Sequence, residues 1–96
     1  MKKEDIIHLL DKINYQRHIT KNWYLNPLEV HRELACLSEQ FKQEEIGKSV
    51  KGNSIRKIIW GKGSTRVMMW SQMHGNESTT TRALINLLFL IDENLS

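Results

Sequence analysis

A histidine and a glutamate separated by two residues lie in the stretch "WSQMHGNEST", which covers residues 70–79. An imidazole nitrogen and a carboxylate oxygen are both zinc ligands, and two histidines with one glutamate and an open water position form a known catalytic pattern. Gly75 permits a tight turn, so that His74 and Glu77 can face one crevice. In a simpler interpretation, Glu77 complements the positive end of the following helix and His74 is a solvated turn residue. The spacing of the two residues leaves both interpretations open.

The segments on either side of this turn must position the two side chains. Residues 65–71 (TRVMMWS) predict a strand, and the unbroken apolar run at 67–70 is typical of a central strand covered on both faces. Residues 78–91 predict a helix that is apolar around nearly its whole circumference. His74 would then follow the carboxyl end of a strand, where open α/β sheets bind their ligands.

Two further helices and two further strands are expected upstream. Residues 4–13 have the apolar spacing of a short amphipathic helix. A second helix is expected from Asn26, as N-cap, to about Gln43, with Pro27 at its first position. Its apolar stripe consists of Val30, Leu34, Leu37 and Phe41. Strands are predicted at 46–50 and 54–60, separated by turn residues, which makes the fold class α/β.

Composition narrows the class of protein and its partners. A chain of 96 residues with a net charge of +3 and 40% hydrophobic residues is one small domain at most. Cys36, expected as a small buried residue of the second helix, is the single cysteine, so an internal disulfide is excluded and a reducing compartment is favoured. Neither a secretory signal nor an apolar run long enough for a bilayer is evident, so we expect a cytoplasmic protein without a membrane partner. A nucleic-acid partner is not expected, because no basic stripe with interleaved aromatic residues occurs.

The segment "WSQMHGNESTTTRALINLL" at residues 70–88 resembles the first metal-ligand segment of the zinc carboxypeptidases, in particular bacterial members with an SQMHG(N/D)E signature. Upstream, "IGKSVKGNSI" at residues 46–55 resembles the G-x-S-x-x-G-R turn of that family, although Asn53 replaces the usual arginine. The resemblance covers residues 28–92 and is strongest at 67–88. Asn76 also departs from those peptidases that carry arginine just before the ligand glutamate.

The resemblance implies that His74 and Glu77 are the first two ligands of a Zn²⁺ ion. In the family, the third ligand, the general-base glutamate and the residues that clamp the substrate carboxylate come from farther downstream. Residues 1–96 would therefore be a partial, N-terminal segment of a carboxypeptidase-like mixed sheet with flanking helices. The expected function is that of a metallopeptidase, a hydrolase that cleaves a peptide amide bond, with this chain inactive by itself.

Two alternatives accompany this prediction. A zinc deacylase of the aspartoacylase or succinylglutamate desuccinylase type also carries an HGNE segment and would act on N-acyl amino acids. The G-x-S-x-x-G turn favours the carboxypeptidase. In the other alternative, the chain is catalytically silent and self-associates through its apolar C-terminal helix, for which the sequence offers no obvious cover.

Overall fold

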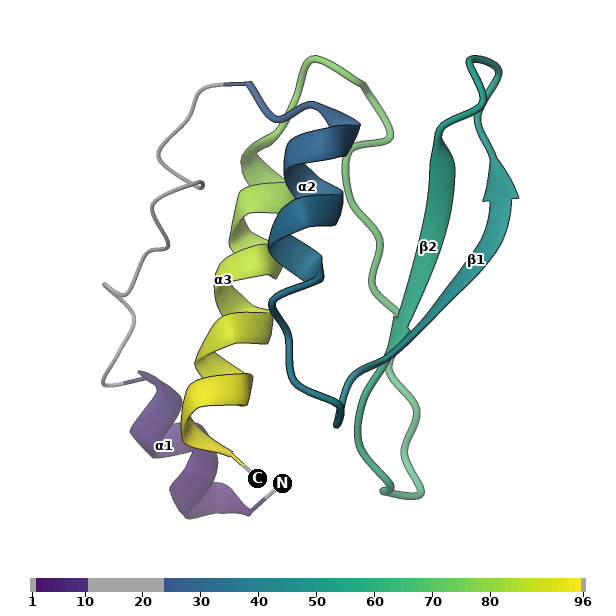
Figure 1. Cartoon of the computed structure of the whole chain (residues 1–96). Coiled ribbons are helices and arrows are strands. Elements are labelled where there is room, and N and C mark those ends of the chain that lie inside the picture. The colour runs from purple at the N-terminus through teal and green to yellow at the C-terminus, as the bar shows by residue number, and fades with distance from the viewer. Residues whose placement is uncertain (1, 11–23, 96) are drawn as a thin grey trace.

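The computed structural model describes residues 2–10 and 24–95. Within these residues the fold is mixed α/β, with three helices and one two-stranded antiparallel sheet (Figure 1). In chain order, the elements are α1 (Lys3–Leu10), α2 (Pro27–Leu34), β1 (Lys42–Lys48), β2 (Ser54–Ile59) and α3 (Thr79–Asn94). The predicted first helix is confirmed as far as residue 10, and residues 11–13 of that prediction lie outside the described part of the chain. No helix in the described ranges is long and apolar enough to cross a bilayer.

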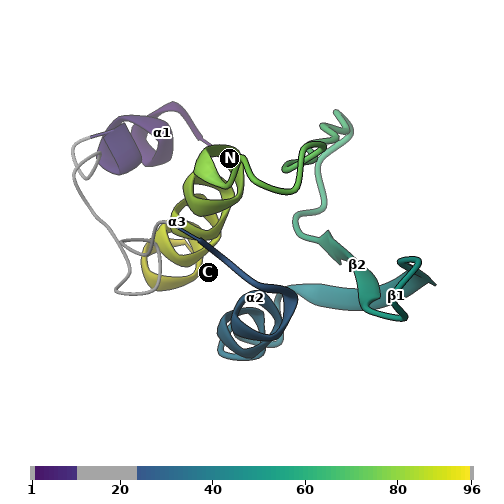
Figure 2. The ribbon, with the colours of Figure 1, turned by 90° about the horizontal axis from the view of Figure 1, so that it is seen from above.

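Helix α3 lies at the centre of the helical part of the molecule. Seen from above, α1 and α2 lie on different sides of α3, and the β1–β2 hairpin lies beyond α2 (Figure 2). Ile85 is 2% exposed, Phe89 3% and Ile91 6%, and they pack into one core with residues from α2 and the loop after it. The prediction of this helix is confirmed, with its start one residue later and its end three residues later than expected.

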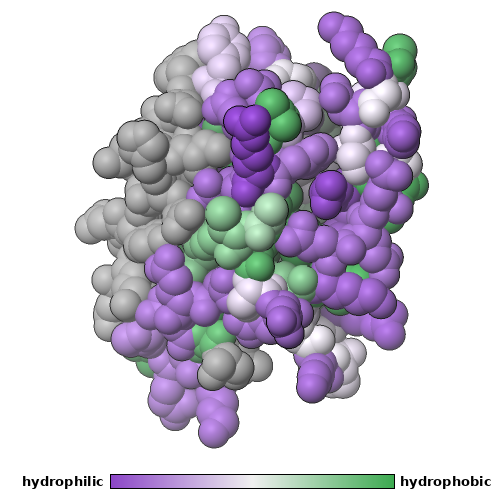
Figure 3. All heavy atoms as spheres, in the orientation of Figure 1, coloured by the Kyte–Doolittle hydropathy of each residue, from purple (hydrophilic) through white to green (hydrophobic). Residues whose placement is uncertain are grey.

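The expectation that helix α3 lacks a cover is wrong. Its large apolar side chains are all buried or half-buried. The cover comes from α2 and from Leu37 and Phe41 beyond it, which pack against the same core cluster. The face of the molecule in Figure 3 is mostly hydrophilic, with one apolar area at its centre and smaller apolar areas elsewhere.

Helix α2 begins as predicted but ends nine residues earlier than expected. The Asn26 side chain accepts a hydrogen bond from the Glu29 backbone N–H at 2.8 Å, and Pro27 occupies the first helical position. After Leu34 the backbone tightens, because the Cys36 and Leu37 N–H groups donate to the Glu33 and Leu34 carbonyls three residues earlier. The Ser38 backbone N–H donates to the Asp92 carboxylate at 3.0 Å instead of to a carbonyl four residues earlier. Leu37 and Phe41 are still buried, so the prediction that the four apolar residues of the stripe face the core holds for both, although they lie beyond the helix.

The two strands form a hairpin, with Ser49 and Gly52 of the G-x-S-x-x-G stretch in its loop and Gly47 within β1. Strand β2 is close to its prediction, whereas β1 begins and ends earlier than the predicted 46–50. The Ser49 backbone N–H donates to the Asn53 carbonyl at 2.8 Å, and the Asn53 N–H donates to Ser49 Oγ at 3.1 Å. Gly52 has a φ of 83°, which favours glycine. In this chain, Ser49, Gly52 and Asn53 therefore stabilise the hairpin loop through their own hydrogen bonds and backbone conformation.

A central strand at residues 65–71 was predicted wrongly. In the structure this segment is irregular and links the hairpin to α3 (Figure 1). Its apolar side chains are exposed, by 73% at Val67, 81% at Met68 and 63% at Trp70. The described sheet pairs only β1 with β2, so no neighbouring strand supplies hydrogen bonds to this backbone. An apolar run favours a buried strand, but a strand forms only where a partner backbone lies beside it.

A polar cluster fastens the hairpin to the end of α3. Trp60 follows β2 and stacks on Phe41 with a ring-centroid distance of 6.2 Å, and its indole N–H donates to Gln40 Oε1 at 3.1 Å. Gln40 Nε2 donates to Asp92 at 2.9 Å and to the Leu95 carbonyl at 3.2 Å. The loop before β1, the end of β2 and the last turn of α3 therefore meet at one point.

Candidate metal centre

His74 and Glu77 lie on one tight turn immediately before α3. The Glu77 backbone N–H donates to the His74 carbonyl at 3.0 Å, which closes the turn over Gly75 and Asn76. Ser78 follows as the buried N-cap of α3. The structure therefore brings the two predicted ligands together on a turn, as their spacing suggested. The element before the turn is the exposed segment 65–71 instead of a buried strand.

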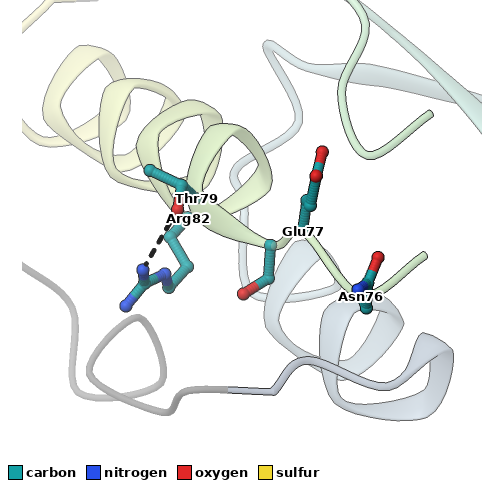
Figure 4. A pocket seen from close by; sticks show the side chains of 5 residues that line it. Asn76, Glu77, Thr79 and Arg82 are labelled. Atoms are coloured by element: carbon teal, nitrogen blue, oxygen red, sulfur yellow. Dashed lines mark hydrogen bonds between the residues drawn. The ribbon is translucent and has the colours of Figure 1, made fainter. Parts of the chain in front are cut away.

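Both side chains are available to an outside ligand. His74 and Glu77 are exposed, and neither side chain makes a hydrogen bond or an ion pair within residues 2–10 and 24–95. Figure 4 shows the Glu77 carboxylate pointing away from the Arg82 guanidinium. An accessible imidazole nitrogen and an accessible carboxylate oxygen fit the ligand preferences of zinc.

A shallow hollow of about 180 Å³ lies beside the turn. It is lined by Asn76, Glu77, Ser78, Thr79 and Arg82 (Figure 4). Arg82 Nη2 donates to Thr79 Oγ1 at 3.5 Å, so its guanidinium lies along the first turn of α3. The positive end of α3 and this guanidinium make the hollow favourable for negative charge next to Glu77.

The turn carries two protein donors, which is fewer than a catalytic zinc site uses. Among the described residues, no three His, Cys, Asp or Glu side chains come close enough together to hold a metal ion. Of the other histidines, His8 is exposed on α1 and His31 is half-buried on α2. A metal bound at the turn by this part of the chain would have His74 and Glu77 as its protein ligands.

Hydrogen bonds from α3 support the turn, and the sequence pattern around His74 and Glu77 does not predict them. Thr81 Oγ1 donates to Gln72 Oε1 at 2.6 Å, and Gln72 Nε2 donates to the Gly75 carbonyl at 2.9 Å. Ser71 Oγ lies 2.8 Å from Thr81 Oγ1. The sequence contains one signal of this contact. Gln72 is a polar residue just after the apolar run at 67–70, and Thr81 is a polar residue within the apolar helix α3.

Two carboxyl groups away from the turn, those of Glu44 and Asp92, have lowered pKa values. A side-chain hydrogen bond from Lys42 and the charge of Lys57 lower the pKa of Glu44 on β1. Burial by itself would raise the pKa of Asp92, but hydrogen bonds from Ser38 and Gln40 bring the pKa below its ordinary value. Cys36 is exposed and lies beyond α2, which corrects the prediction of a buried helical cysteine and follows from the early end of that helix.

Comparison of the chain with protein-family models, with curated proteins and with solved structures found no match. A zinc-carboxypeptidase function therefore remains a prediction from the resemblance of residues 70–88. The structure adds that His74 and Glu77 lie on one tight turn.

Proposed function

We propose that this chain supplies the first two zinc ligands, His74 and Glu77, of a metallocarboxypeptidase-like hydrolase. One observation carries the proposal: both donors are exposed on a single turn that the bond from Glu77 N–H to the His74 carbonyl closes. The SQMHGNE resemblance supports the identity of the metal and the class of reaction. Zinc, when bound, supplies a Lewis acid that polarises an amide carbonyl and lowers the pKa of water.

The chain's own residues have a limited part in this chemistry. His74 would bind through a neutral imidazole nitrogen and Glu77 through its carboxylate. The third ligand, the general base and the groups that bind the carboxylate of a peptide substrate are assigned to other parts of the protein. The chain by itself is therefore expected to bind zinc without hydrolysing peptides.

The finer fold proposal is that residues 1–96 form an N-terminal part of a carboxypeptidase-like sheet. Residues 67–70 support it, because four consecutive apolar side chains are exposed here and a larger fold would cover them.

The first experiment is a zinc titration of the purified chain followed by NMR. Zn²⁺ is expected to shift the His74 imidazole resonances and the Glu77 backbone resonances, and His74→Gln is expected to abolish the shift at Glu77. His8→Gln is the matched control, because His8 is an exposed histidine on α1. Zinc-induced shifts around residues 74–77 that persist in His74→Gln would refute the assignment of this ligand.

A second experiment tests the division of labour. The zinc-loaded chain is incubated with an N-acylated dipeptide, and release of the C-terminal amino acid is measured. No release above that of the metal-free chain is expected. Zinc-dependent turnover that disappears in Glu77→Gln but not in Glu39→Gln would show that the chain carries a complete site, contrary to the proposal.

A further inference from the structure

Gln72 has a backbone conformation that its residue type rarely adopts. Its φ is 57°, and it is the only non-glycine residue with a positive φ among residues 2–10 and 24–95. A left-handed backbone is uncommon for a residue with a long side chain and no local hydrogen bond of the Asn or Asp kind. Such a conformation persists where surrounding contacts determine it.

The side chain of Gln72 supplies these contacts by joining α3 to the turn. Its carbonyl oxygen accepts from the Thr81 hydroxyl at 2.6 Å, and its amide nitrogen donates to the Gly75 carbonyl at 2.9 Å. The second bond fixes the orientation of the amide, because only the nitrogen of the side chain can donate to a carbonyl. The Gln72 backbone N–H also points to the Thr80 hydroxyl, at 3.4 Å.

The direction of every hydrogen bond in this group follows. A threonine hydroxyl has one proton, and that of Thr81 is used toward Gln72. The Ser71 hydroxyl must therefore be the donor in its contact with Thr81, at 2.8 Å. Thr81 is 8% exposed, so the group is anchored on a buried residue of the helix. A continuous series of hydrogen bonds runs from Ser71 through Thr81 and Gln72 to Gly75.

Gly75 stands between the two candidate ligands, so its carbonyl is well placed to control them. Fixing this carbonyl fixes the peptide plane at the centre of the turn that the His74–Glu77 bond closes. We propose that Gln72 is a positioning residue that holds His74 and Glu77 in one orientation for a divalent cation. This inference rests on the proposed zinc site, and it assigns to Gln72 the role of a supporting hydrogen-bond partner.

The test replaces the amide without adding charge. Gln72→Met keeps the length of the side chain and removes both of its hydrogen bonds. The matched control is Gln43→Met, because Gln43 Nε2 also donates to a backbone carbonyl, that of Leu34 at 2.8 Å, away from the turn. The first measurement is the solvent-exchange rate of the Glu77 amide without metal, and the second is zinc affinity from an NMR titration.

Gln72→Met is expected to speed exchange of the Glu77 amide and to weaken zinc binding by about tenfold, as loss of a supporting partner does in metal sites. Gln43→Met is expected to change neither quantity. Gln72→Gly, which accepts the positive φ without a side chain, is expected to weaken zinc binding as Gln72→Met does.

The outcomes separate the two proposals. If the wild-type chain binds no zinc at His74, the proposed function is refuted. If the wild-type chain binds zinc and Gln72→Met binds it equally well, the positioning role is refuted and the zinc site stands. Wild-type affinity in Gln72→Gly with reduced affinity in Gln72→Met would show that the backbone, and not the side-chain amide, sets the turn, which also refutes the role.

Discussion

Replacing Asp92 by asparagine should loosen the attachment of the hairpin to α3. The Asp92 carboxylate accepts hydrogen bonds from the Ser38 backbone N–H, the Ser38 hydroxyl and Gln40 Nε2. These partners are 52 to 54 residues away in the chain. An asparagine has one acceptor oxygen, and its amide nitrogen would face a donor where the second carboxylate oxygen was.

The size of the effect follows from the number of bonds lost. A hydrogen bond to a charged acceptor contributes about 1.5–3 kcal/mol to the free energy of unfolding, and less where solvent reaches it. Asp92 is half-buried and would lose at least one of its bonds, with the remaining bond weakened by loss of the charge. We expect a loss of about 2 kcal/mol at pH 7, which corresponds to a drop in Tm of roughly 10 °C for a chain of this size.

The stabilisation should depend on pH in a defined direction. Burial by itself would raise the pKa of Asp92, but the hydrogen bonds from the Ser38 side chain, from Gln40 and from the Ser38 backbone together bring the pKa below its ordinary value of 3.8. A carboxyl group whose pKa is lower in the folded state stabilises the fold above its unfolded pKa. That stabilisation is lost as the pH falls through the folded-state pKa. The difference between wild type and Asp92→Asn should therefore be complete at pH 7 and shrink below a pH of about 3.8.

The assay is urea unfolding followed by tryptophan fluorescence at several pH values, with Glu39→Gln as the control. Glu39 is an exposed carboxylate in the same loop as Ser38 and Gln40. An Asp92→Asn variant no less stable than Glu39→Gln at pH 7 would refute the argument. A difference that stays constant from pH 7 to pH 3 would refute the role assigned to the charge.

Three further changes test the core, the hairpin loop and the start of α2. Ile85→Ala removes a side chain that is 2% exposed and should cost about 2–4 kcal/mol in urea unfolding, whereas Ile46→Ala, at a position 61% exposed, should cost far less. Gly52→Ala should lower the free energy of unfolding by about 1 kcal/mol, because the backbone φ of 83° is strained for alanine even though the added Cβ would meet no other atom. Gly63→Ala is the control. Gly63 has no positive φ, so this change should be close to neutral in the same assay. Asn26→Ala should cost about 1 kcal/mol of stability and reduce the NMR helical shifts at the start of α2, and unchanged shifts would contradict its capping role.

The predictions confirmed by the structure concern features that close within a few residues. Asn26 and Pro27 start a helix with a bond that spans three residues. Ser49 and Asn53 form the hairpin loop across four. The residues of α3 form a helix, as their spacing predicts. Each of these depends on neighbouring residue types, which a sequence displays directly.

The wrong predictions concern features that depend on distant partners. Residues 65–71 have the composition of a strand, but the described sheet offers them no neighbouring strand. Beyond the early end of helix α2, the Ser38 backbone N–H donates to Asp92, which is 54 residues away in the chain. No local pattern in either segment reveals whether such a partner will be present.

For the candidate site, the sequence by itself predicted that an imidazole and a carboxylate share one short turn before a helix, because His74 and Glu77 are three residues apart and Gly75 between them permits a tight turn. The tertiary structure decided what lies around that turn. It left His74 and Glu77 exposed, and it tied Gln72 to Thr81 on α3 and to Gly75 in the turn. The physical reason is the range of the contacts: a turn is closed by bonds within itself, whereas its orientation is set by hydrogen bonds to a helix that only the folded chain brings beside it.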